Sequence, residues 1–368
     1  MEGDKISRVA AIGTGTIGAS WTAVFLARGL TVAASDPAPG AETFLREFVG
    51  AAWPTLARLS PLPADPPWAA LTFHTEPEAA LAGAEFVQES APEREELKRA
   101  LLARLDAVLD PEIVIASSSS GLLMSRLQDD CRHPERCVIG HPFNPPHLVP
   151  LVEVVGGEKT ASGAIERALA FYTAIGKQPI HIRREVPGHV ANRLQAALWR
   201  EALHLVAEGV ASVADVDMAI SAGPGLRWAL MGPCLTFHLA GGGGGMAHML
   251  DHFGAALDEP WTRLAAPPLT PELRDRMIDG CVRQADGRSV ADLERLRDGF
   301  LADLLDLIER HAVTPRTGSQ QIRSQREDGG KMGSARTVGR GKEAEPAEPV
   351  GTVAAGEPAA PAIRLCDS

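Results

Sequence analysis

A glycine pattern near the start of the chain restricts the possible folds more than any other feature. Gly13, Gly15 and Gly18 form G-x-G-x-x-G between the apolar run RVAAI and a helical stretch. The first glycine permits a tight turn, the second lets the backbone approach a pyrophosphate, and the third allows close helix–strand packing. The helix N-terminus adds free N–H donors for the phosphates. We therefore expect a βαβ unit that binds a dinucleotide, with Thr16 and Ile17 of the turn also beside the cofactor.

The end of the second strand indicates which dinucleotide binds. TVAAS is followed by Asp36, whose carboxylate can accept hydrogen bonds from both ribose hydroxyls and would repel a 2′-phosphate. Pro37 and Ala38 come next, so no arginine is placed to bind that phosphate. The predicted cofactor is NAD. The alternative is a flavodoxin-like domain whose glycine-rich turn binds no cofactor.

Strand-like and helical segments alternate from residue 7 to about residue 186. This alternation predicts a doubly wound, Rossmann-type parallel sheet covered by helices on both sides, in a domain spanning residues 1–186. Between the strands, EREELKRALLARLDAVL carries apolar residues at helical spacing, with charges on the opposite face. The four leucines of that face are Leu97, Leu101, Leu105 and Leu109. The expected strands are RVAAIG, TVAASD, EFVQES, IVIAS, CVIGH and PIHIR.

Residues 187–311 have a different character, because strand signals disappear and helical periodicity dominates. We expect an all-helical second domain for substrate binding and dimerisation, beginning at Pro187-Gly188, where proline resists continuing the preceding element. Residues 312–368 show no periodic apolar pattern and are expected to form a disordered tail. Three tryptophans are expected to pack in the helical core: Trp199, Trp228 and Trp261.

Composition excludes several classes of partner. With 368 residues the chain is long enough for two domains, and its net charge of −11 disfavours a nucleic-acid partner. No apolar run approaches the roughly 18 residues of a membrane span. Five scattered cysteines without C-x-x-C suit reduced thiols in the cytoplasm. His248 and His252 are spaced i,i+4 but have no third ligand, so no metal site is predicted.

Polar residues at expected strand ends form a candidate active site. The segment GHPFNP contains His141 and Asn144 and leads into an apolar strand near Glu153. IVIAS runs into a series of serines that ends at Ser120, and Asn192 lies near the start of the first long helix of the second domain. Ligands of such sheets bind at the carboxyl ends of the strands, so these residues are expected to meet there.

The combination suits hydride transfer from a secondary alcohol. The hydroxyl proton must leave when the hydride leaves. Histidine, with a pKa near 6.5, is the natural base near neutrality, and this role is expected of His141. A carboxylate on the second ring nitrogen would fix the tautomer and stabilise the imidazolium, which is the role expected of Glu153. Ser120 and Asn192 would hold the substrate oxygen. The alternative is that His141 is only a packed loop residue.

Over residues 6 to about 310 the chain resembles the L-3-hydroxyacyl-CoA dehydrogenase family. The motifs that carry this resemblance are the glycine pattern, S-S-S-S-G, H-P-F-N-P followed by L-V-E-V-V, and P-G-H-V-A-N-R-L. The resemblance implies a homodimer formed through the helical domain and closure of a cleft between the domains. It implies that His141 and Glu153 are the catalytic pair and that Ser120 and Asn192 contact the substrate. It also places Glu93 and Lys98 beside the nicotinamide and its ribose.

Two departures bear on the substrate. Ser118 stands where the acyl-CoA enzymes typically have asparagine, and GPGLRWALMGPC brings Arg227 into the helical domain. The motifs GHPFNPPHLVPLVE and GLRWA resemble the lambda-crystallin/L-gulonate 3-dehydrogenase branch and bacterial L-carnitine dehydrogenases more than they resemble the acyl-CoA enzymes. The enzymes of these two groups act on free 3-hydroxy acids. Arg227 is therefore expected to bind a substrate carboxylate, with Asn144 as a further substrate contact. A structural salt bridge is the alternative for Arg227.

The predicted function is an NAD-dependent oxidoreductase that interconverts a 3-hydroxy acid, or its acyl thioester, and the 3-oxo form. Two alternatives stay open. One is a ketoreductase acting on a 3-oxo intermediate of bacterial polyketide antibiotic biosynthesis. The other is a non-catalytic, crystallin-like protein that keeps an NAD site.

Overall fold

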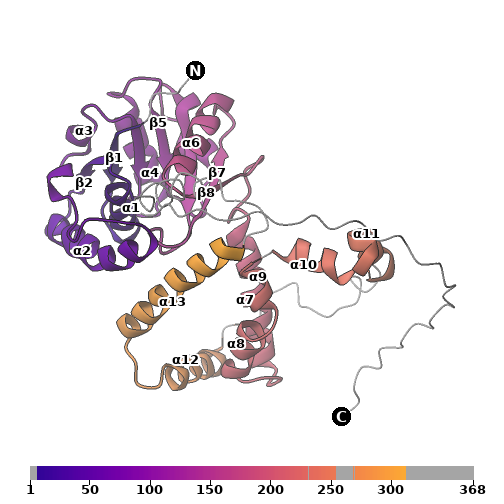
Figure 1. The fold of residues 1–368 in the computed structure, drawn as a ribbon. Helices are drawn as coiled ribbons and strands as arrows, with labels where there is room; N and C mark the ends of the chain where they lie inside the picture. Colours follow the sequence, from indigo (N-terminus) through magenta and orange to yellow (C-terminus); the bar gives the residue numbers. More distant parts are fainter. Residues whose placement is uncertain (1–5, 231, 254–267, 269, 312–368) are drawn as a thin grey trace, which may run out of the picture. The chain divides into compact units, whose positions relative to one another are not determined.

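The computed structural model describes residues 6–230, 232–253, 268 and 270–311 (Figure 1). The expected tail at 312–368 and Trp261 lie outside these residues. The first part of the chain forms an eight-stranded sheet in the order β3-β2-β1-β4-β5-β6-β7-β8. Its strands are β1 (Arg8–Ile12), β2 (Thr31–Ser35), β3 (Leu71–His74), β4 (Phe86–Glu89), β5 (Val114–Ser117), β6 (Cys137–Pro142), β7 (Leu151–Gly156) and β8 (Gln178–His181).

One strand pair departs from the predicted parallel sheet. All neighbouring strands are parallel except β6 and β7, which are antiparallel. Only residues 143–150 connect these two strands, which is too few for the crossover that a parallel pair requires. The sheet is therefore mixed, and its reversal pairs His141 directly with Glu153. Strand β3 was not among the predicted strands; it lies at the edge of the sheet, and only Leu71 of its four residues is buried, so it lacks the apolar run of an inner strand.

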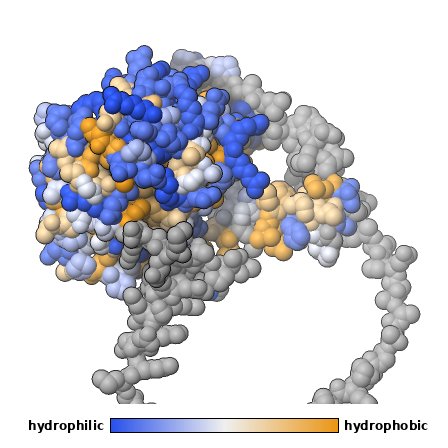
Figure 2. Space-filling model, turned by 90° about the horizontal axis from the view of Figure 1, so that it is seen from above, coloured by the Kyte–Doolittle hydropathy of each residue, from blue (hydrophilic) through white to orange (hydrophobic). Residues whose placement is uncertain are grey.

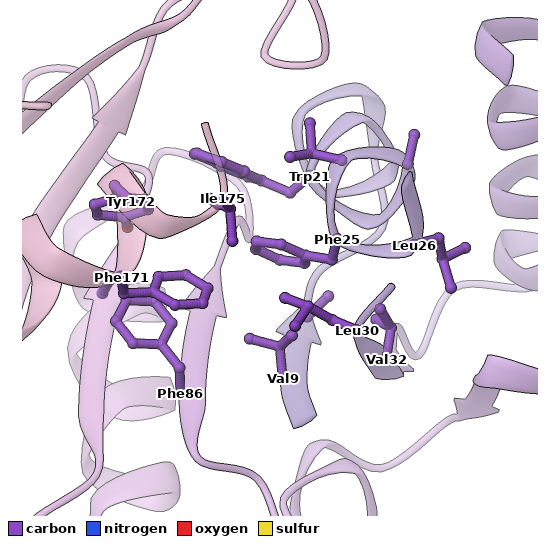
Figure 3. Packing of buried hydrophobic residues seen from close by; sticks show 14 of the residues in the cluster. Val9, Trp21, Phe25, Leu26, Leu30, Val32, Phe86, Phe171, Tyr172 and Ile175 are labelled. Carbon is purple, nitrogen blue, oxygen red and sulfur yellow. The ribbon is translucent and has the colours of Figure 1, made fainter. Parts of the chain in front are cut away.

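Helices cover both faces of the sheet and form two buried apolar clusters. On one face Phe86 stacks on Phe171 with ring centroids 4.0 Å apart, and Trp21 stacks on Phe25 at 5.5 Å (Figure 3). Helices α1, α2 and α6 contribute to this cluster, and α3, α4 and α5 to the other. Their bounds are α1 (Thr16–Ala27), α2 (Ala41–Leu59), α3 (Pro77–Ala80), α4 (Glu95–Asp106), α5 (Met124–Leu127) and α6 (Ser162–Ala174).

The predicted apolar face of α4 is only partly right. Of the four predicted leucines only Leu105 is fully buried, and the buried residues of the helix are Lys98, Leu102, Leu105 and Asp106. Each has a partner: Lys98 Nζ lies 2.9 Å from Glu89 Oε1, and Asp106 Oδ1 lies 2.7 Å from Arg136 Nη2. Pairing offsets the cost of burying each charge, so the inward side of α4 keeps helical spacing but includes two charged residues that an apolar pattern does not identify.

From residue 187 onward the described chain is helical. Its buried apolar cluster is small and consists of Val206, Val213 and Leu273. Trp199 and Trp228 are 54% and 38% exposed, so the prediction that they pack in a helical core is wrong for the described residues, which do not cover these side chains. None of the described helices is long and apolar enough to cross a membrane. The helices are α7 (Ala191–Ala207), α8 (Val213–Ser221), α9 (Pro224–Trp228), α10 (Pro233–Ala240), α11 (Gly245–Phe253), α12 (Pro271–Ala285) and α13 (Val290–His311).

Candidate active site

The glycine turn is tightly packed at two positions and open at the third. Gly13 has a positive φ of 88°, and a Cβ there would lie 2.7 Å from the carbonyl carbon of Ser90. A Cβ on Gly18 would lie 1.8 Å from the Gly13 oxygen, whereas Gly15 has nothing within 4 Å. The open position faces away from the packed core at the N-terminus of α1, where N–H donors are free. This arrangement fits the pyrophosphate of a dinucleotide.

Asp36 follows β2 and is held by the backbone of the same turn. Its Oδ2 accepts a hydrogen bond from Thr14 N at 2.8 Å, and its Oδ1 accepts one from Ala38 N at 2.9 Å. The side chain is half-buried. Oδ2 also accepts a hydrogen bond from Thr14 Oγ1 at 3.3 Å, whereas Oδ1 retains a lone-pair site, so Asp36 can still accept a hydrogen bond from a ribose hydroxyl.

A pocket of about 610 Å³ lies at the carboxyl ends of the strands. The strand order reverses between β1 and β4, and ligands of open α/β sheets bind at such a reversal. Seven of the predicted site residues line this pocket: Ile17, Glu93, Lys98, Ser120, His141, Asn144 and Asn192. Sequence reasoning did not select as site residues the three other lining residues with polar side chains, namely Ser90, Ser118 and Gln195.

His141 and Glu153 form a buried pair at the pocket wall. His141 Nδ1 lies 2.8 Å from Glu153 Oε2, and the other carboxylate oxygen accepts hydrogen bonds from Val190 N and Ala191 N, each at 2.9 Å. Burial alone would raise the pKa of Glu153, but the hydrogen bonds from His141 and from these two amides lower it below its usual value. Glu153 is thus an ionised partner of the ring, and Nε2 of His141 remains available to a ligand.

The loop that carries Ser120 is held by Glu93. Glu93 Oε1 accepts hydrogen bonds from Ser119 Oγ at 2.6 Å and from the backbone amides of Ser120 and Gly121 at 2.9 and 3.1 Å. Burial raises the pKa of Glu93, but the Ser119 hydroxyl, the charge of Lys98 and these amides lower it overall. An ionised Glu93 therefore fixes the end of the serine loop beside the pocket.

Two residues at the start of the helical region complete the site. Asn192 Nδ2 donates to the Ser120 carbonyl at 3.3 Å, which brings these two predicted substrate contacts together. His189 Nε2 lies 3.2 Å from the Ser119 carbonyl, and its ring centroid is 5.1 Å from that of His141. Burial lowers the pKa of His189, so a neutral ring donates to that carbonyl. Sequence reasoning missed His189, although the P-G-H-V-A-N-R-L motif contains it.

Arg227 is not brought to this pocket. It lies on α9 and lines a separate cavity of about 460 Å³ with mainly apolar residues of α9 and α10. Within the described part of the chain the structure shows no ion pair for Arg227. Nor do three His, Cys, Asp or Glu side chains there converge as metal ligands. The side chain of His252, considered above as a ligand, lies outside the described residues.

A dinucleotide turn and a histidine–carboxylate pair on a Rossmann-type sheet define an NAD-dependent dehydrogenase that acts on a CH–OH group. The chain belongs to the 3-hydroxyacyl-CoA dehydrogenase family. The family's NAD binding domain matches residues 8–186, and its C-terminal domain matches residues 188–280. The intact pair of His141 and Glu153 at the pocket favours a working enzyme over the non-catalytic alternative.

Several relatives carry the name L-carnitine dehydrogenase. That of Streptomyces coelicolor is 59% identical over 302 residues, which cover 82% of this chain and 95% of the relative. That of Pseudomonas aeruginosa is 51% identical over 306 residues, covering 83% and 94%. Among solved structures, the NAD⁺-dependent 5-formyl-3-hydroxy-2-methylpyridine 4-carboxylic acid 5-dehydrogenase matches with a TM-score of 0.69 and 28% identity. That match covers 83% of this chain and 99% of the other.

Proposed function

We propose that this enzyme oxidises L-carnitine, a free 3-hydroxy acid with a quaternary ammonium group, to the 3-oxo compound. The contact between His141 and Glu153 in the pocket is the observation that supports oxidation of an alcohol, because it provides a base with an ionised partner. The substrate follows from similarity: relatives 51% and 59% identical over most of the chain are L-carnitine dehydrogenases.

The proposed roles follow from the contacts of each residue. When bound, NAD supplies the hydride acceptor; the turn from Gly13 to Gly18 would hold its pyrophosphate and Asp36 its adenosine ribose. His141 Nε2 takes the hydroxyl proton, and Glu153 stabilises the resulting imidazolium. The remaining proposed contacts are Ser120 and Asn192 with the substrate oxygen, Asn144 with the substrate, and Glu93 and Lys98 with the nicotinamide and its ribose.

Arg227 is proposed as the partner of the substrate carboxylate. A guanidinium can bind a carboxylate through two parallel hydrogen bonds, and Arg227 is exposed and without an ion pair among the described residues. Its position in a cavity separate from His141 makes this the role that most needs a direct test.

Two finer assignments concern the assembly and the compartment. The helical region exposes many large apolar side chains, among them Leu226, Phe237 and Leu239. Patches of this kind on a soluble protein mark interaction sites, and the family resemblance implies a homodimer, so we assign a second copy to this face.

Cys131 and Cys137 are free thiols with sulfur atoms 3.9 Å apart, which suits a reducing cytoplasm.

The ketoreductase alternative predicts a different substrate. None of the relatives named above is a polyketide ketoreductase. An aromatic 3-oxo acid therefore belongs in the substrate test as the compound that would favour this alternative.

The experiment measures NAD reduction with L-carnitine, L-gulonate and 3-hydroxybutyryl-CoA, and NADH oxidation with acetoacetyl-CoA and an aromatic 3-oxo acid. Wild type and Arg227→Ala are compared for each compound. We expect the highest kcat/KM with L-carnitine and a loss of about tenfold or more in Arg227→Ala, because a charged hydrogen-bonding partner is removed. Preference for the CoA esters would refute the proposed substrate. Unchanged activity on L-carnitine in Arg227→Ala would refute the role of the arginine.

A further inference from the structure

A chain of hydrogen bonds leads from the buried core to the pocket. Tyr172 Oη donates to Gln88 Oε1 at 2.6 Å, and Gln88 Nε2 donates to Ser118 Oγ at 2.9 Å. Ser118 Oγ in turn lies 2.9 Å from Ser90 Oγ, where either hydroxyl can be the donor. Tyr172 and Gln88 are fully buried, whereas Ser118 and Ser90 are half-buried and line the pocket. The chain therefore ends at a surface that a ligand can reach.

The orientation of the Gln88 amide determines the direction of the first links. Gln88 Nε2 lies 3.5 Å from the Ala116 carbonyl, so the opposite orientation would place two acceptor oxygens against each other. Burial raises the pKa of Tyr172, which keeps its proton for donation. The phenol packs against Gly140, where an added Cβ would lie 2.0 Å from Tyr172 Oη. Gln88 consequently accepts from Tyr172 and donates to Ser118.

The remaining link is directed by the number of lone pairs on Ser118. Trp21 Nε1 also donates to Ser118 Oγ, at 3.2 Å. A hydroxyl oxygen accepts two hydrogen bonds and donates one, so Trp21 and Gln88 fill both acceptor sites. Ser118 must therefore donate its proton to Ser90. The Ser90 proton is then free for an acceptor in the pocket.

The position of Ser90 indicates which part of a ligand it meets. Ser90 follows β4, the strand next to β1 at the reversal of strand order. Its Cβ is 3.4 Å from where a Cβ on Gly18 would lie, and its backbone packs against Gly13. Ser90 thus lies against the turn beside which the ribose–phosphate backbone of a dinucleotide runs.

We propose that Ser90 donates a hydrogen bond to an oxygen of the ribose–phosphate backbone of bound NAD, and that Tyr172, Gln88 and Ser118 orient its proton. Ser90 contacts the cofactor directly, whereas the other three are positioning residues. This inference rests on NAD binding but not on L-carnitine as the substrate.

The test measures NADH binding by fluorescence, in the absence of substrate. The variants compared with wild type are Ser90→Ala, Gln88→Glu and the double variant. Ser90→Ala is expected to weaken binding about 5- to 20-fold, as for loss of one hydrogen bond to a polar or charged group. A carboxylate at position 88 only accepts, so Ser118 would donate to it and Ser90 to Ser118. Gln88→Glu should therefore cause a similar loss, and the double variant should bind no more weakly than Ser90→Ala.

Competition with ADP-ribose, which lacks the nicotinamide, identifies the acceptor. Ser90→Ala should weaken ADP-ribose and NADH by the same factor. A loss confined to NADH would place the acceptor on the nicotinamide and overturn the assignment. The assignment would also be overturned if Ser90→Ala bound NADH within twofold of wild type. The same holds if the two losses of NADH affinity multiplied in the double variant, as simple charge repulsion from Gln88→Glu would produce.

Ser162→Ala, at the exposed start of α6, is the matched control and should bind NADH as wild type does. Thermal unfolding checks that each variant is folded. If Gln88→Glu does not fold, Tyr172→Phe replaces it, because it removes the donor that orients the amide. Tyr172→Phe should cause a smaller loss of NADH affinity than Ser90→Ala. That loss should disappear when Ser90 is already alanine, and a loss of affinity that persists there would contradict the proposal. Because no substrate is present, these outcomes are independent of the L-carnitine test.

Discussion

The nucleotide-binding domain and the helical region bury their apolar side chains to very different extents. In the first, both faces of the sheet are covered and two large clusters are fully buried. In the second, the buried cluster has three members, whereas large apolar side chains of α7 and α9 to α13 are exposed. In Figure 2 the nucleotide-binding domain shows a mainly hydrophilic surface, and the segment with α10 and α11 shows hydrophobic colour. Among the described residues, the first domain completes its own core, whereas the helical region leaves much of its apolar surface exposed.

The two regions also contribute different parts of the site. The nucleotide-binding domain supplies the glycine turn and both members of the pair His141 and Glu153. The helical region supplies Asn192 and the amides of Val190 and Ala191, which donate to Glu153. The domain with the complete core therefore supplies the proposed acid/base pair, and the second region orients the carboxylate of Glu153.

The largest effect on turnover is expected from a substitution in the nucleotide-binding domain, compared with one in the helical region. His141→Ala should reduce turnover by about 10²- to 10⁴-fold, because the general base is lost, while NADH binding is retained. Steady-state kinetics with L-carnitine, the proposed substrate, and an NADH titration measure both. Gln195→Ala, which alters a pocket residue of α7, should have a much smaller effect on turnover. Near-normal turnover in His141→Ala would show that the acid/base assignment is wrong.

A pair of matched leucine substitutions compares the packing of the two regions. Leu105 on α4 is 0% exposed and Leu296 on α13 is 58% exposed. Leu105→Ala should lower the free energy of unfolding by about 2 to 5 kcal/mol, because a cavity remains in the core. Leu296→Ala should change it by less than about 0.5 kcal/mol. Urea denaturation measures both, and equal losses would show that the contrast in burial does not hold in solution.

The smallest effect on stability is expected where the assembly is tested. Leu239 on α10 is 59% exposed, so Leu239→Asp should change the free energy of unfolding of a single chain by less than about 0.5 kcal/mol. If a second copy covers this face, a buried unpaired carboxylate would separate the copies. Sedimentation should then show a dimer for wild type and a monomer for the variant. A monomeric wild type would rule out the proposed homodimer.

What the sequence alone determined was local or periodic. The βαβ unit with Gly13 to Gly18 and Asp36 could be predicted because turn, strand and helix signals lie within a short stretch, and NAD followed from them. The change to a helical region near Pro187 was visible because the hydrophobic period changes there. His141 and Glu153 were selected because their types and spacing suit proton transfer, and the reversal of β7 brings them into contact.

Tertiary structure decided whatever depends on contacts between distant segments. The buried side of α4 includes Lys98 and Asp106, whose burial depends on ion pairs with partners on other elements that an apolar pattern does not identify. The placement of Arg227 away from the pocket and the exposure of Trp199 likewise depend on how short helices pack. The direction of the Ser90 proton depends on hydrogen bonds among side chains up to 97 residues apart. A hydrogen-bond direction is set by all the partners around each atom, and the folded chain alone brings those partners together.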